Sequence, residues 1–296
     1  TPFYINPKLN LDWEVNDKNK LLLSYTYNTT NSRVIDIYDN FVLTNFRSFN
    51  KGTNSFNQLT SSNITFNYQL GDWSDKFFAN TSIVYNNYFD YFSSNSIITQ
   101  NYTQSERILI KSRNVFTIFS DVNRYLKAIS SNLKLDVNYT KSNYENQVNN
   151  SEFREIKSTN YAIGFELRSG FQSMFNYHFG SKWTTNQIRT PSINNSFTNN
   201  VSFINLSFDL SDKFDIEIEN ERYYFDNIDN GDNTYYFSDI ELRYKLKKNK
   251  INLSLSGKNL FNTETFRTFS ISDISTSTTE YRLLKRFVLL KMEYRF

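Results

Sequence analysis

The sequence ends on the stretch Tyr281–Phe296, YRLLKRFVLLKMEYRF, and this stretch decides the fold. From position 288 onward every second residue is apolar or aromatic, namely Val288, Leu290, Met292, Tyr294 and Phe296. The residues between them include Lys291, Glu293 and Arg295. A period of two places the two sets on opposite faces of a β-strand. The chain is therefore predicted to end in a strand with one apolar face and one charged face.

The composition favours strands over helices. Of the 296 residues, 18% are aromatic, with 21 Tyr and 28 Phe, whereas Gly (7) and Pro (3) are scarce. Aromatic residues are enriched in strands. The mean hydropathy is −0.59, and the apolar runs are far shorter than the about 20 residues that a spanning helix needs. A membrane-spanning barrel remains allowed, because its strands carry polar residues on the lumen side.

Charge and cysteine content exclude several classes of protein. The chain has no cysteine, which excludes a disulfide scaffold and any thiolate metal site. Its net charge of +3 comes from interleaved signs, without a basic block suited to nucleic acid. The first residues, TPFYINPKL, show neither a starting Met nor a signal peptide. An exported protein with this start is expected to be processed or a fragment.

The alternation of the last stretch recurs along the whole chain, in about thirteen segments. The first two, Leu9–Val15 and Leu21–Tyr27, form a hairpin around the polar turn Asn16–Asn19. Long and short connections then alternate strictly, and the long ones include Asn28–Gln58 and Asn262–Glu280. Short periplasmic turns and longer external loops are typical of outer-membrane barrels. We therefore predict an all-β fold, a transmembrane antiparallel up-and-down β-barrel, over a soluble β-sandwich.

Aromatic residues are expected to form two girdles at the strand ends, where amphipathic rings suit the lipid headgroups. The set expected at the outer ends is Tyr25, Tyr27, Tyr85, Tyr139, Tyr161, Tyr224 and Tyr236. The set expected at the inner ends is Trp13, Trp73, Tyr294 and Phe296.

The strand count has a consequence for the size of the barrel. If the last strand descends to the periplasm, strict alternation makes the first of thirteen strands descend too, so the chain begins outside the cell. Single-chain bacterial barrels have an even number of strands, so thirteen cannot close one. The chain is expected to be the C-terminal portion of a larger barrel, with earlier strands missing or on another chain. A fourteen-strand barrel is the alternative if Asn28–Gln58 or Asn262–Glu280 hides a strand.

Several features resemble known outer-membrane families. A terminal strand of alternating residues that ends on Phe296 resembles the C-terminal assembly signal of bacterial outer-membrane barrels. Asn259–Asn262, NLFN, follows the penultimate strand and resembles the corresponding turn of TonB-dependent receptors. The start around Pro7–Leu11 and the composition rich in Asn and Tyr are similar to the barrel family common in Bacteroidota.

The resemblance implies an architecture and a set of partners. Receptors of this family have about 22 strands around a plug, so residues 1–296 would be the C-terminal part of the barrel. The plug domain and the earlier strands would be absent from this chain. The implied partners are outer-membrane lipid, the plug domain and TonB through the missing parts, the barrel assembly machinery, and a small-molecule, glycan or peptide ligand. No segment of this chain matches the family's TonB-contacting segment or plug.

Catalytic and metal-binding patterns are missing from the sequence. His178, the single histidine, is expected to be a polar residue that faces the lumen. No Ser-His-Asp arrangement, phosphate loop or HExxH motif occurs, so we expect neither an enzyme nor a cofactor. Asp226–Asn233, DNIDNGDN, is similar to a calcium loop but places Ile228 where an oxygen ligand is needed. An external turn is the preferred interpretation.

Charged residues gather on two neighbouring strands of the predicted lumen wall. A hairpin folded symmetrically about Asn230 pairs them as Asp215 with Lys245, Glu217 with Arg243, Glu219 with Glu241 and Glu221 with Asp239. A slip of two residues would leave the faces unchanged. The predicted acidic patch is Glu219, Glu221, Asp239 and Glu241, with Lys258 in reach of Asp239. It is interpreted either as a solvated wall or as an anchor for arginines of a plug.

The sequence thus predicts the barrel portion of an outer-membrane TonB-dependent receptor for active uptake of a scarce ligand. Two alternatives remain. One is a passive outer-membrane channel with a smaller closed barrel, and the other is a structural scaffold of a secretion or adhesin complex. All three place the chain in the cell outer membrane of a Gram-negative bacterium.

Overall fold

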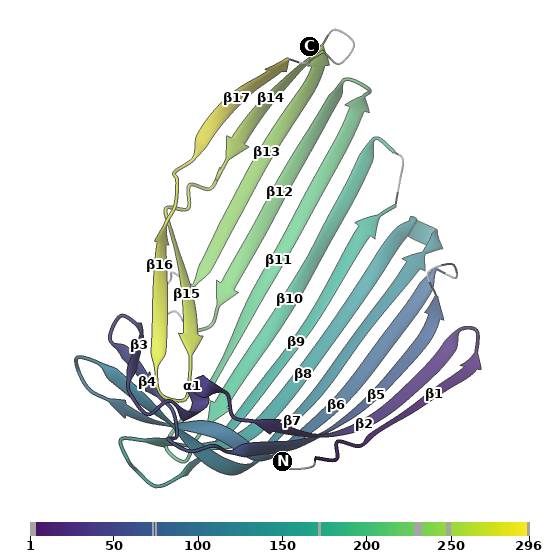
Figure 1. Ribbon diagram of the computed structural model, residues 1–296. Coiled ribbons are helices and arrows are strands. Elements are labelled where there is room, and N and C mark those ends of the chain that lie inside the picture. Colours follow the sequence, from purple (N-terminus) through teal and green to yellow (C-terminus); the bar gives the residue numbers. More distant parts are fainter. Residues whose placement is uncertain are drawn as a thin grey trace.

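Thirteen antiparallel strands follow one another in chain order and form one curved wall in the computed structural model, which describes residues 4–72, 74, 76–170, 173–227, 233–246 and 250–294 (Figure 1). The strands of the wall are β1 (Lys8–Asn16), β2 (Asn19–Asn31), β5 (Gln58–Asp72), β6 (Phe77–Ile98), β7 (Thr103–Leu126), β8 (Ser131–Val148), β9 (Arg154–Ser169), β10 (Phe175–Arg189), β11 (Asn194–Ser211), β12 (Phe214–Phe225), β13 (Thr234–Leu246), β14 (Ile251–Lys258) and β17 (Phe287–Tyr294). The predicted all-β, up-and-down architecture is confirmed.

Short turns lie at one end of the wall, and the two long connections, residues 32–57 and 259–286, lie at the other (Figure 1). At that second end β6 and β7, β8 and β9, and β10 and β11 are extended strands joined by turns of four or five residues. The N-terminal end of the described chain lies among the long connections, and the C-terminal end lies with the short turns. Both β1 and β17 therefore run toward the short-turn end, as the alternation predicts. A short 3₁₀ helix, Lys127–Ile129, is part of the turn between β7 and β8.

The wall is a single layer with two open edges. In the part of the chain that the structure describes, β1 pairs with β2 and β17 pairs with β14, and neither edge has a second partner. Few apolar side chains are buried among these residues; they are Ile110, Ile156, Ala162, Phe197 and Tyr235. A β-sandwich would bury the inner faces of two sheets against each other. The soluble sandwich is therefore the wrong interpretation.

Each of the two long connections that could hide a strand contains a hairpin outside the wall. The first holds the helix α1 (Val34–Ile37), β3 (Val42–Asn45) and β4 (Ser48–Lys51). β4 pairs in parallel with the start of β7, residues 103–106. The second holds β15 (Thr265–Ile271) and β16 (Thr276–Arg282), which form a separate two-stranded sheet. Through the pairing of β4 with β7 the sheet has fifteen strands, but neither hairpin joins the up-and-down path of thirteen. The fourteen-strand alternative therefore does not apply to the described residues.

The prediction of aromatic residues at strand ends is correct for some strands only. Tyr224 and Tyr236 lie near the long-loop ends of β12 and β13. In contrast, Tyr85 and Tyr139 lie in the middle of β6, which has 22 residues, and β8, which has 18. Those strands continue well beyond the expected end, because their loop-side halves keep pairing although their apolar alternation fades. Trp73 and Phe296 lie outside the described residues.

Hydropathy gives a further result. Among the described residues, no helix is long and apolar enough to cross a membrane.

Candidate functional site

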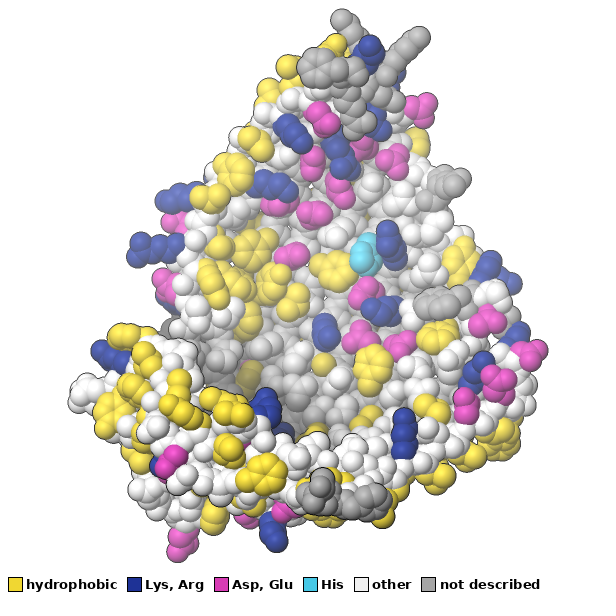
Figure 2. Space-filling model, in the orientation of Figure 1, with side chains coloured by type: hydrophobic (Ala, Val, Ile, Leu, Met, Phe, Trp, Pro, Cys, Tyr) yellow, Lys and Arg dark blue, Asp and Glu magenta, His cyan; other side chains and the backbone are white. Residues whose placement is uncertain are grey.

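Charged side chains of both signs, together with the histidine, spread over the hollow face of the wall (Figure 2). On β12 and β13 the pairing differs from the symmetric hairpin by two residues. Asp215 lies opposite Arg243, Glu217 opposite Glu241 and Glu219 opposite Asp239. The predicted register is therefore wrong, whereas the predicted faces are right, because a slip of two residues keeps every side chain on its face.

The observed register places one guanidinium within reach of two carboxylates. The guanidinium of Arg243 binds two carboxylates of the neighbouring strand at once: Nε lies 2.6 Å from Oδ2 of Asp215, and Nη2 lies 2.8 Å from Oε2 of Glu217. The symmetric hairpin would have offered Arg243 only Glu217 directly opposite. Two charge-assisted hydrogen bonds from one guanidinium are stronger and more directional than one.

The structure divides the predicted acidic patch. Glu219, Glu221 and Asp239 line one cavity of about 690 Å³, whereas Glu241 does not line it. The Nζ atom of Lys258 lies 2.9 Å from Oδ2 of Asp239, which confirms the predicted contact. Arg282 also lines this cavity. Two cations thus accompany three carboxylates, and the patch is less negative than the sequence indicates.

His178 occupies a polar position on the same hollow face. Its Nε2 lies 3.3 Å from Oε2 of Glu166, and the other oxygen of Glu166 lies 3.4 Å from Nζ of Lys134. The edge of the imidazole contacts the ring of Phe203 at 4.8 Å between centroids. Within the described ranges, no group of three or more His, Cys, Asp or Glu side chains could hold a metal ion. The calcium-like loop has its centre, residues 228–232, outside the described residues.

The terminal strand keeps the two faces that its sequence predicts. Leu290 pairs with Leu255 and Met292 pairs with Leu253, so apolar residues lie side by side on one face. On the other face Lys291 pairs with Ser254. The apolar side chains are open to the surroundings, with Leu290 and Met292 each 70% exposed. The last residue of the predicted assembly signal, Phe296, lies outside the described residues.

A buried carboxylate fastens the first long connection to the wall. Asp36 of α1 is 3% exposed, and its carboxylate lies 3.1 Å from Nε of Arg33 and 2.8 Å from Nη1 of Arg107 on β7. Burial alone would raise the pKa of Asp36, but hydrogen bonds from Arg33 and the charge of Arg107 hold that pKa below its usual range. A Cβ at Gly52 would lie 2.6 Å from the Asp36 carbonyl oxygen, so the close approach of the two segments needs glycine.

The second long connection is anchored at its base by aromatic rings. Phe266 of β15 lies within 5.0–5.9 Å, between ring centroids, of four rings on β12 and β13. These rings are Tyr223, Phe225, Tyr235 and Phe237. Thr263, just before β15, donates a hydrogen bond of 2.7 Å to the backbone oxygen of Tyr236. The base of the β15–β16 hairpin is thereby held on the hollow face of the wall.

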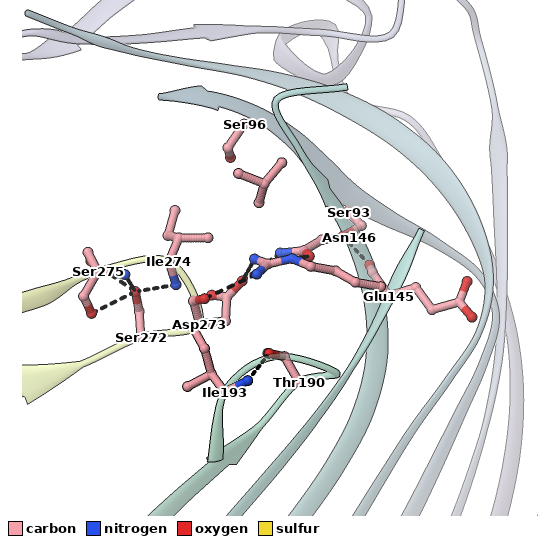
Figure 3. A network of polar contacts seen from close by, with 12 residues as sticks. Ser93, Ser96, Glu145, Asn146, Thr190, Ile193, Ser272, Asp273, Ile274 and Ser275 are labelled. Carbon is pink, nitrogen blue, oxygen red and sulfur yellow. Dashed lines mark hydrogen bonds and ion pairs between the residues drawn. The ribbon is translucent and has the colours of Figure 1, made fainter. Parts of the chain in front are cut away.

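The tip of the same hairpin reaches a distant part of the wall. Asp273 lies in the turn between β15 and β16, and its carboxylate contacts Asn146 of β8 and Arg154 of β9 (Figure 3). The base rests on β12 and β13, so the hairpin extends across the loop end of the hollow face from one group of strands to another (Figure 1).

Two cavities lie beside this crossing. One, of about 320 Å³, has Lys51, Tyr144, Asn146 and Asp273 in its lining, and the other, of about 420 Å³, has Asp36. Both are lined by Tyr91, Phe92 and Arg107. These residues carry no signal in the sequence, because they belong to long connections and strand extensions without a sustained period. The turn-forming run around Asp273 is the one local signal, and it does not reveal the partner.

No family model and no curated protein matches this chain. Similar solved structures include the ferric enterobactin receptor PfeA of Pseudomonas aeruginosa, with a TM-score of 0.49 and 11% identity over 88% of this chain and 43% of that chain. The copper transporter OprC has the same score and identity, over 97% of this chain and 49% of that one. A FadL homologue of Pseudomonas aeruginosa has a TM-score of 0.35 and 8% identity over 97% and 76%. The chain spans about half the length of the first two.

Proposed function

We propose that this chain is the barrel wall of an outer-membrane receptor for active, TonB-dependent uptake of a scarce ligand in a Gram-negative bacterium. One observation carries the proposal: a thirteen-strand up-and-down wall has exposed apolar side chains on one strand face, charged side chains on its hollow face, and two folded long connections, residues 32–57 and 259–286, at one end (Figure 2). An apolar outside and a polar inside are what lipid and a lumen require. Folded connections at this end support capture of a specific ligand over free diffusion.

The exposed apolar face supports lipid as the surrounding medium. Leu9 and Leu11 on β1 are 67% and 54% exposed, and Val288 on β17 is 68% exposed. An apolar surface of this extent would be an aggregation liability in water. In a bilayer the same side chains would contact acyl chains.

The two open edges support a barrel larger than this chain. Unpaired backbone groups at β1 and β17 would cost several kcal/mol each in hydrocarbon, so a spanning sheet must close on itself. We infer that further strands complete the wall and that this chain is the C-terminal part of a barrel of about 22 strands. The remaining parts would supply the plug and the contact with TonB. Membership of a Bacteroidota-type family stays a prediction.

The acidic wall and the last strand have proposed roles in this assembly. Glu219, Glu221 and Asp239 would bind arginines of the plug, and Glu241 would act from the adjacent position beside Glu217. Val288, Leu290, Met292, Tyr294 and Phe296 would be read by the barrel assembly machinery. We propose a transport function without catalysis, for a small-molecule, glycan or peptide ligand.

Liposome swelling tests active uptake against a passive channel. The complete protein is reconstituted into liposomes, which are then diluted into isotonic maltose. A plugged receptor predicts no swelling above that of empty liposomes, and removal of the plug predicts swelling. Swelling of the complete protein in proportion to its amount would instead support a passive channel. No swelling in either form would contradict a transport lumen and support a scaffold.

A further inference from the structure

Asp273 is presented by a rigid turn at the tip of the β15–β16 hairpin. The backbone N–H of Ser272 donates to the carbonyl oxygen of Ser275 at 2.8 Å, and the hydroxyl of Ser272 accepts from the N–H groups of Ile274 and Ser275. Figure 3 shows this turn with Asp273 pointing at Asn146. The hydrogen bonds of the turn thus hold the backbone that carries the Asp273 side chain.

The receiving site on the wall consists of Arg154 and Asn146, which hold each other in place. The Nε–H of Arg154 donates to Oδ1 of Asn146 at 2.8 Å, and this bond leaves the Asn146 amide N–H groups pointing to the same side as the guanidinium. Both then donate to Oδ2 of Asp273, Arg154 Nη2 at 2.5 Å and Asn146 Nδ2 at 2.7 Å. Arg154 Nη1 also donates to the Asp273 carbonyl oxygen at 3.2 Å. Donors from two strands thus converge on one oxyanion.

The contact between Asp273 and the Arg154–Asn146 pair is largely buried. Asn146 is 6% exposed, and the side chains of Arg154 and Asp273 are 17% and 14% exposed. If the hairpin left without a substitute, the guanidinium of Arg154 would lose both its counter-charge and a charge-assisted hydrogen bond. Another oxyanion in the place of Asp273 would restore both.

The adjacent cavity has room for the rest of such a molecule. Its volume is about 320 Å³, and Asp273 and Asn146 both line it, together with Tyr91 and Tyr144. Arg154 adjoins this cavity through its contacts with Asn146 and Asp273. The cations in the lining itself already have partners within the protein: Lys51 lies 3.1 Å from Asp39 and 3.3 Å from Glu106, and Arg107 lies 2.8 Å from Asp36. Arg154 is the cation whose counter-charge is carried by a hairpin anchored elsewhere.

We propose that Arg154 and Asn146 form a binding site for a small molecule with a carboxylate group, which the protein's own Asp273 fills in the ligand-free state. The incoming carboxylate replaces Asp273, and the β15–β16 hairpin is released from β8 and β9. Binding of the ligand carboxylate and release of the hairpin from the wall are therefore two sides of one exchange of carboxylates at Arg154. The inference rests on the proposed function only in treating the loop end as the ligand entrance.

Spin labels read the position of the hairpin directly. The chain contains no cysteine, so Thr278→Cys on β16 and Glu152→Cys beside β9 can be labelled specifically in the complete protein in detergent. Sodium citrate serves as the probe, and sodium chloride of equal ionic strength controls for screening of the ion pair. The proposal predicts that citrate shifts the label-to-label distances to longer values and that chloride does not. Equal shifts in both salts would overturn it.

Calorimetry with citrate separates the site from its occupant. Asp273→Asn removes the competing carboxylate and should raise the citrate affinity about tenfold, within the usual range of coupling between two linked events. Arg154→Gln should abolish citrate binding. The controls are Glu280→Gln, which removes one negative charge as Asp273→Asn does, and Arg267→Gln, which removes one positive charge as Arg154→Gln does. Glu280 and Arg267 form an ion pair of 2.8 Å within the β15–β16 hairpin, and both control variants should leave the citrate affinity unchanged. Citrate binding that Asp273→Asn does not strengthen, or that survives Arg154→Gln, would overturn the proposal. These measurements need no transport, so their failure is distinguishable from failure of the proposed function.

Discussion

Glu219 of β12 lies directly opposite Asp239 of β13 on the hollow face, two like charges in one cross-strand pair. Like charges in directly opposite positions destabilise a sheet, by roughly 0.2–1 kcal/mol relative to neutral pairs. Lys258 offsets this pair from the next strand, because its Nζ lies 2.9 Å from Asp239. The three residues form one unit in the wall.

Replacement of Lys258 tests this unit. Lys258→Met should lower the free energy of unfolding by about 1 kcal/mol or less, since the pair is partly exposed and screened by water. In the Lys258→Met background, Glu219→Gln should recover part of the loss by removing one of the two carboxylates. Urea unfolding in detergent, followed by tryptophan fluorescence, measures both. Equal effects of Glu219→Gln with and without Lys258 would show that the three charges are independent.

The buried carboxylate Asp36 predicts a pH dependence of the first long connection. The pKa of Asp36 is held below its usual value of 3.8, so the folded segment keeps the ionised form to lower pH than the unfolded segment does. Its contribution to stability is therefore fully present above that usual value and is lost as the pH falls through the lower, folded pKa. Limited proteolysis of residues 33–53 between pH 6 and pH 3 should show protection that fails only at the acid end.

The matched variant for this pH dependence is Asp36→Asn. It leaves two guanidiniums without their shared carboxylate and should expose residues 33–53 to protease at pH 6. The local cost should be about 1–3 kcal/mol, because the side chains of Arg33 and Arg107 reach water. Its cleavage should no longer depend on pH over this range. Protection that persists in Asp36→Asn would contradict the role given to this carboxylate.

Phe266 predicts how the β15–β16 hairpin is held at its base. Phe266→Ala removes ring contacts to four aromatic side chains, each worth about 0.5–1.5 kcal/mol, so the hairpin should detach and become sensitive to protease. Phe261→Ala is the control, because Phe261 is 64% exposed and lies 6.0 Å from Tyr236 alone among the ring contacts of the described residues. A hairpin equally protected in both variants would show that its base is held by other contacts.

The apolar face of the last strand predicts an asymmetric response to charge. Leu290→Lys places an ammonium in acyl chains and should cost about 2–4 kcal/mol if the site is near the bilayer midplane. The neighbouring change Leu289→Lys, on the face of Ser256, should cost little because the lumen is wet. Unfolding free energies in bilayers of defined thickness give the comparison. Equal costs at positions 289 and 290 would contradict the assignment of faces.

The strand pattern was predictable from the sequence, whereas the contacts of the two long connections were not, for one physical reason. Alternation is a local property, so Leu253 and Leu255 reveal their face without knowledge of their neighbours. Register depends on the turn as well, and a slip of two residues on β12 and β13 leaves the local pattern intact. The contact between Asn146 and Asp273 joins residues 127 positions apart. No spacing in the chain encodes it.

The most direct test of the account is the environment of two consecutive residues on β17. Spin labels at Leu290→Cys and Lys291→Cys are compared, in bilayers, for relaxation by oxygen, which concentrates in lipid, and by a water-soluble nickel complex. The account predicts that oxygen relaxes the label at position 290 far more strongly, whereas the nickel complex reaches the label at position 291. Equal accessibility of the two labels to both reagents would contradict a membrane-spanning barrel wall.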